Sequence, residues 1–154
     1  MENKYDSLYI FTTDTVCGIG GPICKQTLDL LYEIKKRPND KKIMILVGSL
    51  EQAQLFDQWN EQATKTAKQY WPGAYSIIVN NQGFRMPNNK LLCDFLLKNG
   101  PMYVTSANIS GQKPININQA SIIFPLIKNV YDFGIPSGIP SSLINLDTNE
   151  ITIR

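Results

Sequence analysis

A short polar turn in the C-terminal third of the chain offers a dense set of small ligand-binding groups. The segment runs from the strand-like residues Tyr103–Thr105 into Ser106, Asn108 and Ser110, and Gly111 follows. Hydroxyl, amide and exposed backbone N–H groups at the end of a strand suit an anionic or nucleotide ligand. The same residues taken alone usually form only a turn, so their function depends on what other segments lie beside them.

A second polar turn follows the strand-like segment Ser7–Thr12. Thr13, Asp14 and Thr15 can simply turn the chain after a strand. The tail Gly18–Gly21 favours a functional interpretation, because its glycines leave room for a ligand close to the backbone. On these residues alone, both a simple turn and a turn that faces a ligand remain open.

Cations are concentrated near the end of an expected helix, where Asp40 alone offsets them. One interpretation is a helix C-terminus whose cations interact with the helix dipole. The other is a phosphate clamp, since lysine supplies a point charge and arginine a planar fork. No Walker A sequence is present, so such a clamp is of another type. The cations are Lys35, Lys36, Arg37, Lys41 and Lys42.

Arg85 is an isolated cation between the apolar residues Phe84 and Met86. Either its stem lies along the surface with the charge in water, or its guanidinium recognises a carboxylate through two hydrogen bonds. The segment Trp71–Gly73 is typical of a helix end and tight turn, with the tryptophan packed in the core.

The composition excludes several kinds of chemistry. The chain has no histidine, which removes Ser-His-Asp triads, Cys-His dyads and histidine-ligated metals. Three cysteines without a CxxC pair argue against a disulfide framework and a structural zinc site. Cys17 and Cys93 are interpreted as small buried residues, and Asp14 has no second carboxylate to build a metal cage. An enzyme of this composition works by positioning and electrostatics, and magnesium carried by nucleotide phosphates is compatible with it.

The bulk properties fit one domain spanning residues 1–154. Hydrophobic residues make up 43% of the chain, enough for a core. The formal charge of +2 is too small for a whole-molecule field to attract nucleic acid, so any anion binding is local. We expect no membrane span and no secretory leader, and a cytoplasmic location.

Strand-like and helix-like segments alternate along the chain, which predicts an α/β fold with a mixed sheet. Apolar runs of strand length and helical periodicity define these segments. The expected strands are 7–12, 42–48, 75–80, 102–105, 130–133, 142–146 and 151–153, and the expected helices are 25–36, 49–56, 60–70, 89–98 and 118–124.

The ordered set of motifs resembles the YrdC-like threonylcarbamoyl-AMP synthases. It covers nearly the whole chain, and the ordered set is far more specific than any single piece. The resemblance implies a twisted mixed parallel and antiparallel sheet flanked by helices around a concave basic cavity. The motifs are Thr13–Gly20, Lys35–Pro38, Trp71–Gly73, Arg85–Pro87, Thr105–Gly111 and Pro140–Ser142.

The family's reaction forms threonylcarbamoyl-adenylate and pyrophosphate from L-threonine, bicarbonate and ATP, with Mg²⁺ expected on the phosphates. Partner proteins then transfer the threonylcarbamoyl group to the adenosine beside the anticodon of certain tRNAs, so the resemblance also implies possible tRNA binding. By similarity, Lys35 and Arg37 hold the triphosphate as the catalytic cations. The remaining nucleotide contacts are Ser106, Asn108 and Ser110, and the threonine contacts are Thr13, Thr15, Arg85, Ser141 and Ser142.

Two alternatives remain open. One is a non-catalytic RNA-binding module that uses the same basic surface for the polyanion. The other is a carbamoyl-adenylate enzyme that handles carbamoyl phosphate, as in hydrogenase maturation proteins with a similar domain.

Overall fold

The computed structural model describes residues 3–36, 38 and 42–154. Arg37, predicted to hold phosphate, lies outside the described residues. The strands are β1 (Tyr9–Phe11), β2 (Gly18–Pro22), β3 (Met44–Leu46), β4 (Tyr75–Val79), β5 (Gln82–Arg85), β6 (Met102–Ser106), β7 (Asn129–Tyr131), β8 (Ser142–Asn145) and β9 (Glu150–Thr152). The helices are α1 (Lys25–Lys35), α2 (Leu50–Gln54), α3 (Glu61–Tyr70), α4 (Lys90–Asn99), the short 3₁₀ turn Ile117–Gln119 and α5 (Ala120–Ile123).

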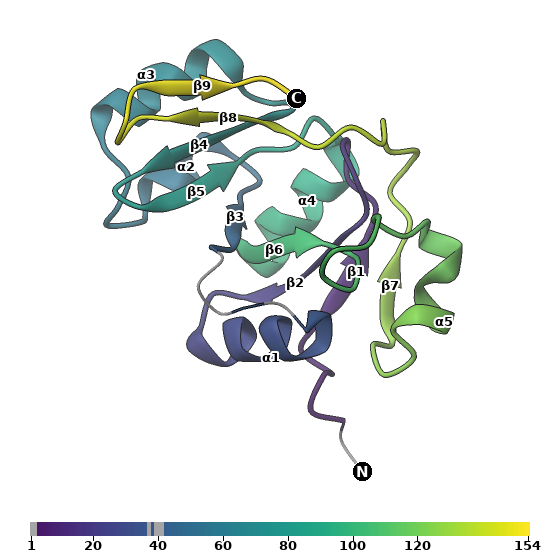
Figure 1. Cartoon of the computed structure of the whole chain (residues 1–154). Helices are drawn as coiled ribbons and strands as arrows, with labels where there is room; N and C mark the ends of the chain where they lie inside the picture. The colour runs from purple at the N-terminus through teal and green to yellow at the C-terminus, as the bar shows by residue number, and fades with distance from the viewer. Residues whose placement is uncertain (1–2, 37, 39–41) are drawn as a thin grey trace.

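The strands form one sheet in the order β7-β1-β2-β6-β3-β5-β4-β8-β9 (Figure 1). The pairs β1·β7, β3·β5 and β4·β8 are parallel, and the other neighbours are antiparallel. The prediction of an α/β fold with a mixed sheet flanked by helices is therefore confirmed. No helix in the described part of the chain is both long and apolar enough to cross a membrane.

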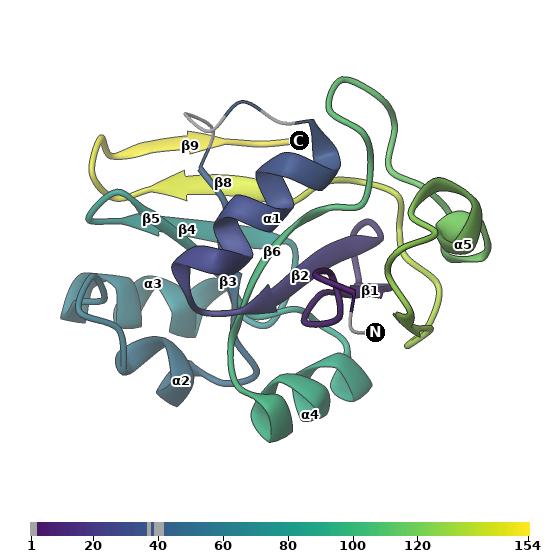
Figure 2. The ribbon, with the colours of Figure 1, turned by 90° about the horizontal axis from the view of Figure 1, so that it is seen from below.

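Helices pack on the sheet through three apolar clusters. Leu30 and Leu31 of α1 join the cluster that contains Ile10, whereas Leu92 of α4 joins the cluster that contains Phe11. Because successive residues of a strand point to opposite faces, α1 and α4 cover opposite faces of β1. Alanines of α2 and α3 pack in the third cluster, and Figure 2 shows α2, α3 and α4 together on one side of the molecule, apart from α1.

The glycine-bearing segment 18–22 is a strand and not a ligand-binding loop, which corrects the sequence interpretation. A Cβ atom on Gly20 would meet the carbonyl oxygen of Tyr103 and lie 2.7 Å from Cγ2 of Val104. These are residues of the paired strand β6. The glycines therefore permit close packing between β2 and its neighbours, and Gly18 alone of them also borders the cavity described below.

The second strand absent from the sequence prediction is β5. It follows β4 through Asn80 and Asn81, which both have positive φ values of 49° and 64°. Two consecutive left-handed residues define the tight turn that matches the twist of a hairpin, and asparagine tolerates this conformation well. The Asn-Asn pair was thus the sequence signal for a hairpin that places Arg85 in the middle of the sheet.

Candidate functional site

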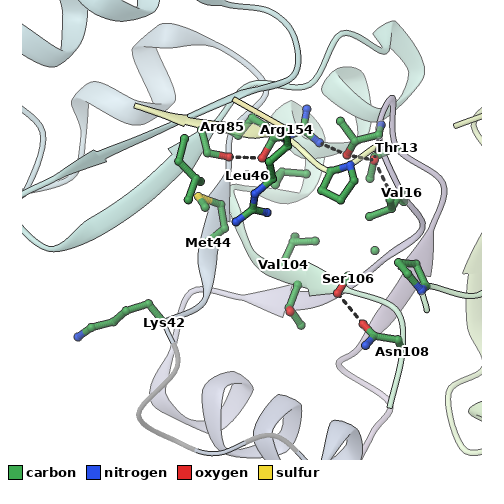
Figure 3. A pocket seen from close by; sticks show the side chains of 18 of the residues that line it. Thr13, Val16, Lys42, Met44, Leu46, Arg85, Val104, Ser106, Asn108 and Arg154 are labelled. Atoms are coloured by element: carbon green, nitrogen blue, oxygen red, sulfur yellow. Dashed lines mark hydrogen bonds between the residues drawn. The ribbon is translucent and has the colours of Figure 1, made fainter. Parts of the chain in front are cut away.

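A cavity of about 520 Å³ lies over the central strands (Figure 3). It collects residues from segments that are far apart in the sequence. Six predicted ligand contacts line it: Thr13, Thr15, Arg85, Ser106, Asn108 and Ser141. The other lining residues are Val16, Gly18, Lys42, Met44, Leu46, Ser76, Ile78, Val104, Thr105, Gln112, Pro114, Pro140, Leu143 and Arg154.

Many of these residues line the cavity because side chains alternate between the two faces of a strand. Side chains two positions apart on a strand share a face. The buried residues between them, Ile45 and Ile77, point away from the cavity into the cluster beneath α2 and α3. The lining pairs two positions apart are Met44 and Leu46 of β3, Ser76 and Ile78 of β4, and Val104 and Ser106 of β6.

Arg85 is buried and ion-paired, which corrects both its description as isolated and the surface interpretation. Its Nη1 atom donates to Oδ1 of Asp14 at 2.7 Å and to the carbonyl oxygen of Gly73 at 3.0 Å. The side chains of Arg85 and Asp14 are 5% and 14% exposed. The other oxygen of Asp14 accepts the backbone N–H of Asn88 at 2.9 Å. The pair therefore ties the turn after β1 to the end of β5.

A directed chain of hydrogen bonds connects Arg85 with the two threonines. Nη2 of Arg85 donates to Oγ1 of Thr15 at 3.1 Å, and Oγ1 of Thr13 donates to the carbonyl oxygen of Val16 at 2.6 Å. The remaining contact, 3.1 Å between the two hydroxyls, then has Thr15 as donor and Thr13 as acceptor. The threonine side chains are thus held in fixed orientations at the cavity wall.

Lys35 lies behind the cavity wall. Its side chain is buried, and Nζ donates to Oγ1 of Thr105 at 2.8 Å, to the carbonyl oxygen of Ser106 at 2.6 Å and to Oδ1 of Asn108 at 3.3 Å. The backbone N–H of Ser110 in turn donates to the carbonyl oxygen of Lys35 at 2.9 Å. These hydrogen bonds therefore join the end of α1 to the polar turn after β6.

Hydrogen bonds also fix the orientation of the Asn108 side-chain amide. Its nitrogen donates to the carbonyl oxygens of Ile109 and Gln112, at 3.0 and 2.8 Å, while its oxygen accepts from the hydroxyl of Ser106. Ser106 and Asn108 border the cavity, and Ser110 does not. The predicted nucleotide-binding turn is therefore held by its own hydrogen bonds, and only part of it lies at the cavity surface.

The two adjacent serines at the start of β8 have different positions. Ser141 lines the cavity and its hydroxyl lies 2.7 Å from that of Ser76 on β4. Ser142 does not line the cavity; its hydroxyl accepts the backbone N–H of Arg154 at 3.0 Å. Ser142 thus holds the chain segment that carries Arg154.

Arg154 lines the cavity but was not predicted from the sequence as a site residue. Thr152 of β9 lies opposite the cavity residue Leu143 of β8, and Arg154 is two positions further along. Alternation along the predicted final strand was the signal that could have placed it on this face. In Figure 3 its side chain extends into the cavity near Arg85.

The described lining of the cavity carries positive charge only. Lys42, Arg85 and Arg154 line it, and no aspartate or glutamate of the described residues does. Asp14 approaches through its ion pair with Arg85 without bordering the cavity. Cations around a shared cavity favour an anionic ligand.

Cys17 lies beside the site, and its thiol is a weak nucleophile. Burial and the nearby charge of Asp132 raise the pKa of the Cys17 thiol to about 11, so it is protonated at neutral pH. The predicted burial of Cys17 and Cys93 is confirmed. Cys17 borders a second hollow of about 950 Å³, which shares Val16, Pro114 and Pro140 with the first cavity. Among the described residues, no three histidine, cysteine, aspartate or glutamate side chains gather around a point where a metal ion could bind.

Comparison with known proteins places these features in context. The family model Sua5_yciO_yrdC, described as "Telomere recombination", matches residues 4–154. The chain is 36% identical over 151 residues to the uncharacterized protein MG259 homolog of Mycoplasma pneumoniae, an alignment that covers 92% of this chain and 31% of that protein. It is 28% identical over 159 residues to the threonylcarbamoyl-AMP synthase of Pyrococcus abyssi, covering 90% of this chain and 47% of the relative. The chain therefore spans about a third to a half of the length of these relatives.

Solved structures share the fold. Sua5 of P. abyssi complexed with L-threonine superposes with a TM-score of 0.82 at 26% identity, covering 94% of this chain and 48% of that one. Escherichia coli YciO superposes with a TM-score of 0.76 at 18% identity, covering 93% and 79%, and shows the fold alone.

Proposed function

Because this chain belongs to the Sua5/YciO/YrdC family, we propose that it forms threonylcarbamoyl-AMP from L-threonine, bicarbonate and ATP, with release of pyrophosphate. One observation carries the proposal: the turn with Thr13 and Thr15, Arg85, and the turn Ser106–Asn108 all border one cavity. The charged residues among its described lining are all cations. The named synthase relatives and the L-threonine complex of a structural neighbour support the same activity.

The proposed reaction needs little acid–base chemistry from the protein. Bicarbonate takes up a proton and loses water to give carbon dioxide, and the amine of threonine captures this carbon dioxide and loses a proton. The product is a carbamate with an anionic oxygen. That oxygen attacks the α-phosphorus of ATP, and the bond between the α-phosphorus and the bridging oxygen to the β-phosphate breaks, so pyrophosphate leaves with the electron pair. In-line alignment and charge neutralisation are then the main requirements. Neither requirement needs a histidine, which this chain lacks.

The threonine end of the cavity is assigned to Thr13, Thr15, Arg85 and Ser141. Nη1 of Arg85 donates to Asp14 and Gly73, while Nη2 donates to Thr15. Nε and the second hydrogen of Nη2 have no acceptor among the described residues and are available to a carboxylate. The hydroxyls of the two threonines and the serine provide polar contacts for the rest of the amino acid.

The nucleotide end is assigned to Ser106 and Asn108. Nζ of Lys35 donates to the carbonyl oxygen of Ser106 and to Oδ1 of Asn108, so its positive charge lies directly behind these two residues. Arg154 and Lys42 add cations at the cavity surface, where they can approach phosphate oxygens. Arg37 and Ser110 remain predicted nucleotide contacts, and Ser142 acts through its hydrogen bond to the Arg154 backbone. The proposal also includes a magnesium ion carried by the ATP phosphates. It further includes partner proteins that transfer the threonylcarbamoyl group to tRNA, and possible binding of tRNA itself.

The test is pyrophosphate release by the purified chain. Release is expected only when ATP, L-threonine and bicarbonate are all present, and the nucleotide product should have the mass of threonylcarbamoyl-AMP. Threonine-independent release would contradict the proposal. Salt-sensitive tRNA binding without any release would favour the RNA-binding alternative.

A further inference from the structure

The strand β7 lies at one edge of the sheet, and no strand in the described part of the chain pairs with its outer side. Thr12 donates its backbone N–H to the carbonyl oxygen of Tyr131 at 3.2 Å, so the backbone groups of Tyr131 face β1. Because successive residues of a strand direct these groups to opposite sides, the N–H and C=O of Val130 point outward. Outward backbone groups on an edge strand are a template for a further strand.

Exposed apolar side chains are concentrated beside this edge. Figure 1 shows β7 and α5 together at the margin of the molecule. Ile122 and Ile123 of α5 and Leu126 after it are exposed, and so are Val130 and Tyr131 of β7. Large apolar residues that gather in one exposed region mark an interaction surface.

The charges that flank β7 are complementary to those of a second copy of the same strand. In an antiparallel pair centred on Val130, the two valines lie directly opposite and exchange both backbone hydrogen bonds. Lys128, two residues before Val130, then lies opposite Asp132 of the other copy, two residues after its valine. A two-fold axis produces this contact twice. Both side chains are exposed, and neither belongs to an ion pair among the described residues of one copy.

This edge lies apart from the cavity over the central strands. None of the residues 122–131 lines that cavity. Figure 2 also shows α5 at the margin of the molecule. A partner on β7 therefore covers the exposed edge without occupying the space assigned to the substrates.

We propose that a second copy of this chain pairs with β7, antiparallel and about a two-fold axis at Val130, so that the sheets of two copies join into one. The axis places both copies of α5 on the same face of the joined sheet, where their exposed apolar residues face a shared groove. Because the same edge is used on both copies, the assembly closes as a dimer. This inference does not depend on the proposed function, since the pairing needs no substrate.

A charge swap tests the register. Sedimentation of the purified wild-type chain over a concentration series should show a mass that rises toward twice that of one chain. Lys128→Glu and Asp132→Lys each bring like charges together twice, so each variant alone should dimerise with a dissociation constant at least about tenfold higher. In an equimolar mixture each substituted side chain meets an opposite charge on the other copy, and dimerisation should return to within about threefold of wild type. Lys98→Glu, on the exposed end of α4, is the control for net charge and should dimerise normally.

Val130→Pro tests the backbone pairing, with Val130→Thr as its matched control. Proline is tolerated on an edge strand where the N–H faces outward, so the monomer should keep its circular dichroism spectrum but lose the ability to dimerise. Threonine keeps the N–H and should dimerise like wild type. A wild-type chain that stays monomeric at every concentration, a mixture of the charge variants that dimerises no better than either alone, or a Val130→Pro dimer of wild-type affinity would each overturn the proposal. Species larger than a dimer would indicate head-to-tail pairing of β7 with the other edge strand, β9, and would overturn the two-fold arrangement.

Discussion

Arg85 and Asp14 are 71 residues apart in the sequence, yet Nη1 of the arginine lies 2.7 Å from Oδ1 of the aspartate. The pair joins the polar turn after β1 to the strand β5 and lies at the cavity wall. The same contact therefore supports the fold and sets the position of the guanidinium that we assign to threonine.

Asp14→Ala is expected to lower the free energy of unfolding by about 3 kcal/mol, because it leaves the buried Arg85 charge without its partner. Urea denaturation followed by circular dichroism measures the change. Asp94→Ala is the control: the side chains of Asp94 and its partner Lys90 are 53% and 86% exposed, so water screens the pair and the expected cost is much smaller. Equal losses in the two variants would mean that the Asp14 pair contributes no more than a surface ion pair.

Arg85→Lys separates the two substrates. The lysine keeps a positive charge for Asp14 but loses the planar fork that can hold a carboxylate. We expect L-threonine affinity to fall about tenfold or more, with ATP affinity nearly unchanged, as measured by calorimetric titration of each ligand. Lost ATP affinity with intact threonine binding would move Arg85 to the phosphate end of the cavity.

Lys35→Met tests whether the end of α1 organises the nucleotide site. The methionine fills a similar volume but donates nothing to Ser106 or Asn108, so the polar turn loses its orientation. ATP affinity is expected to fall at least about tenfold. Lys98→Met, at the exposed end of α4, is the matched control and should bind ATP normally. If the protein acts instead as an RNA-binding module, tRNA affinity should survive Lys35→Met, because diffuse phosphate contacts rarely depend on one buried cation.

Thiol reactivity should differ sharply among the cysteines. The hydrogen bond with Thr27 lowers the pKa of the exposed Cys24, whereas burial raises that of Cys17 to about 11 and also raises that of Cys93. At pH 8, iodoacetamide followed by mass spectrometry should find Cys24 modified first. Rapid labelling of Cys17 in the native state would contradict the described burial.

The raised pKa of Cys17 also predicts a pH dependence of stability. The ordinary pKa of a cysteine thiol is 9.0, as expected in the unfolded chain, whereas folding raises the pKa of Cys17 to about 11. Between these values the unfolded state binds fewer protons, so this group's contribution to stability is present below pH 9.0 and is lost as pH rises toward 11. Cys17→Ala should flatten the decline in urea midpoint over this range, and an unchanged decline would assign it to other groups.

The local pattern of the sequence determined most elements and the segments that contribute to the site. Apolar runs and helical periodicity located β1, β4, β6, β8 and the main helices, because these patterns reflect burial on one face of each element. Ser106, Asn108, Thr13 and Thr15 were recognisable as ligand-binding candidates, because their types and their positions after strands are local properties.

Only the tertiary structure decided what each candidate meets. The glycines of β2 looked like ligand space, but the partner strand β6 fills that space. Arg85 looked isolated, and Arg154 was not singled out at all, because both acquire their surroundings from strands distant in sequence. Strand order and register are set by long-range packing and hydrogen bonding, and these place the charges and the hydroxyls around one cavity.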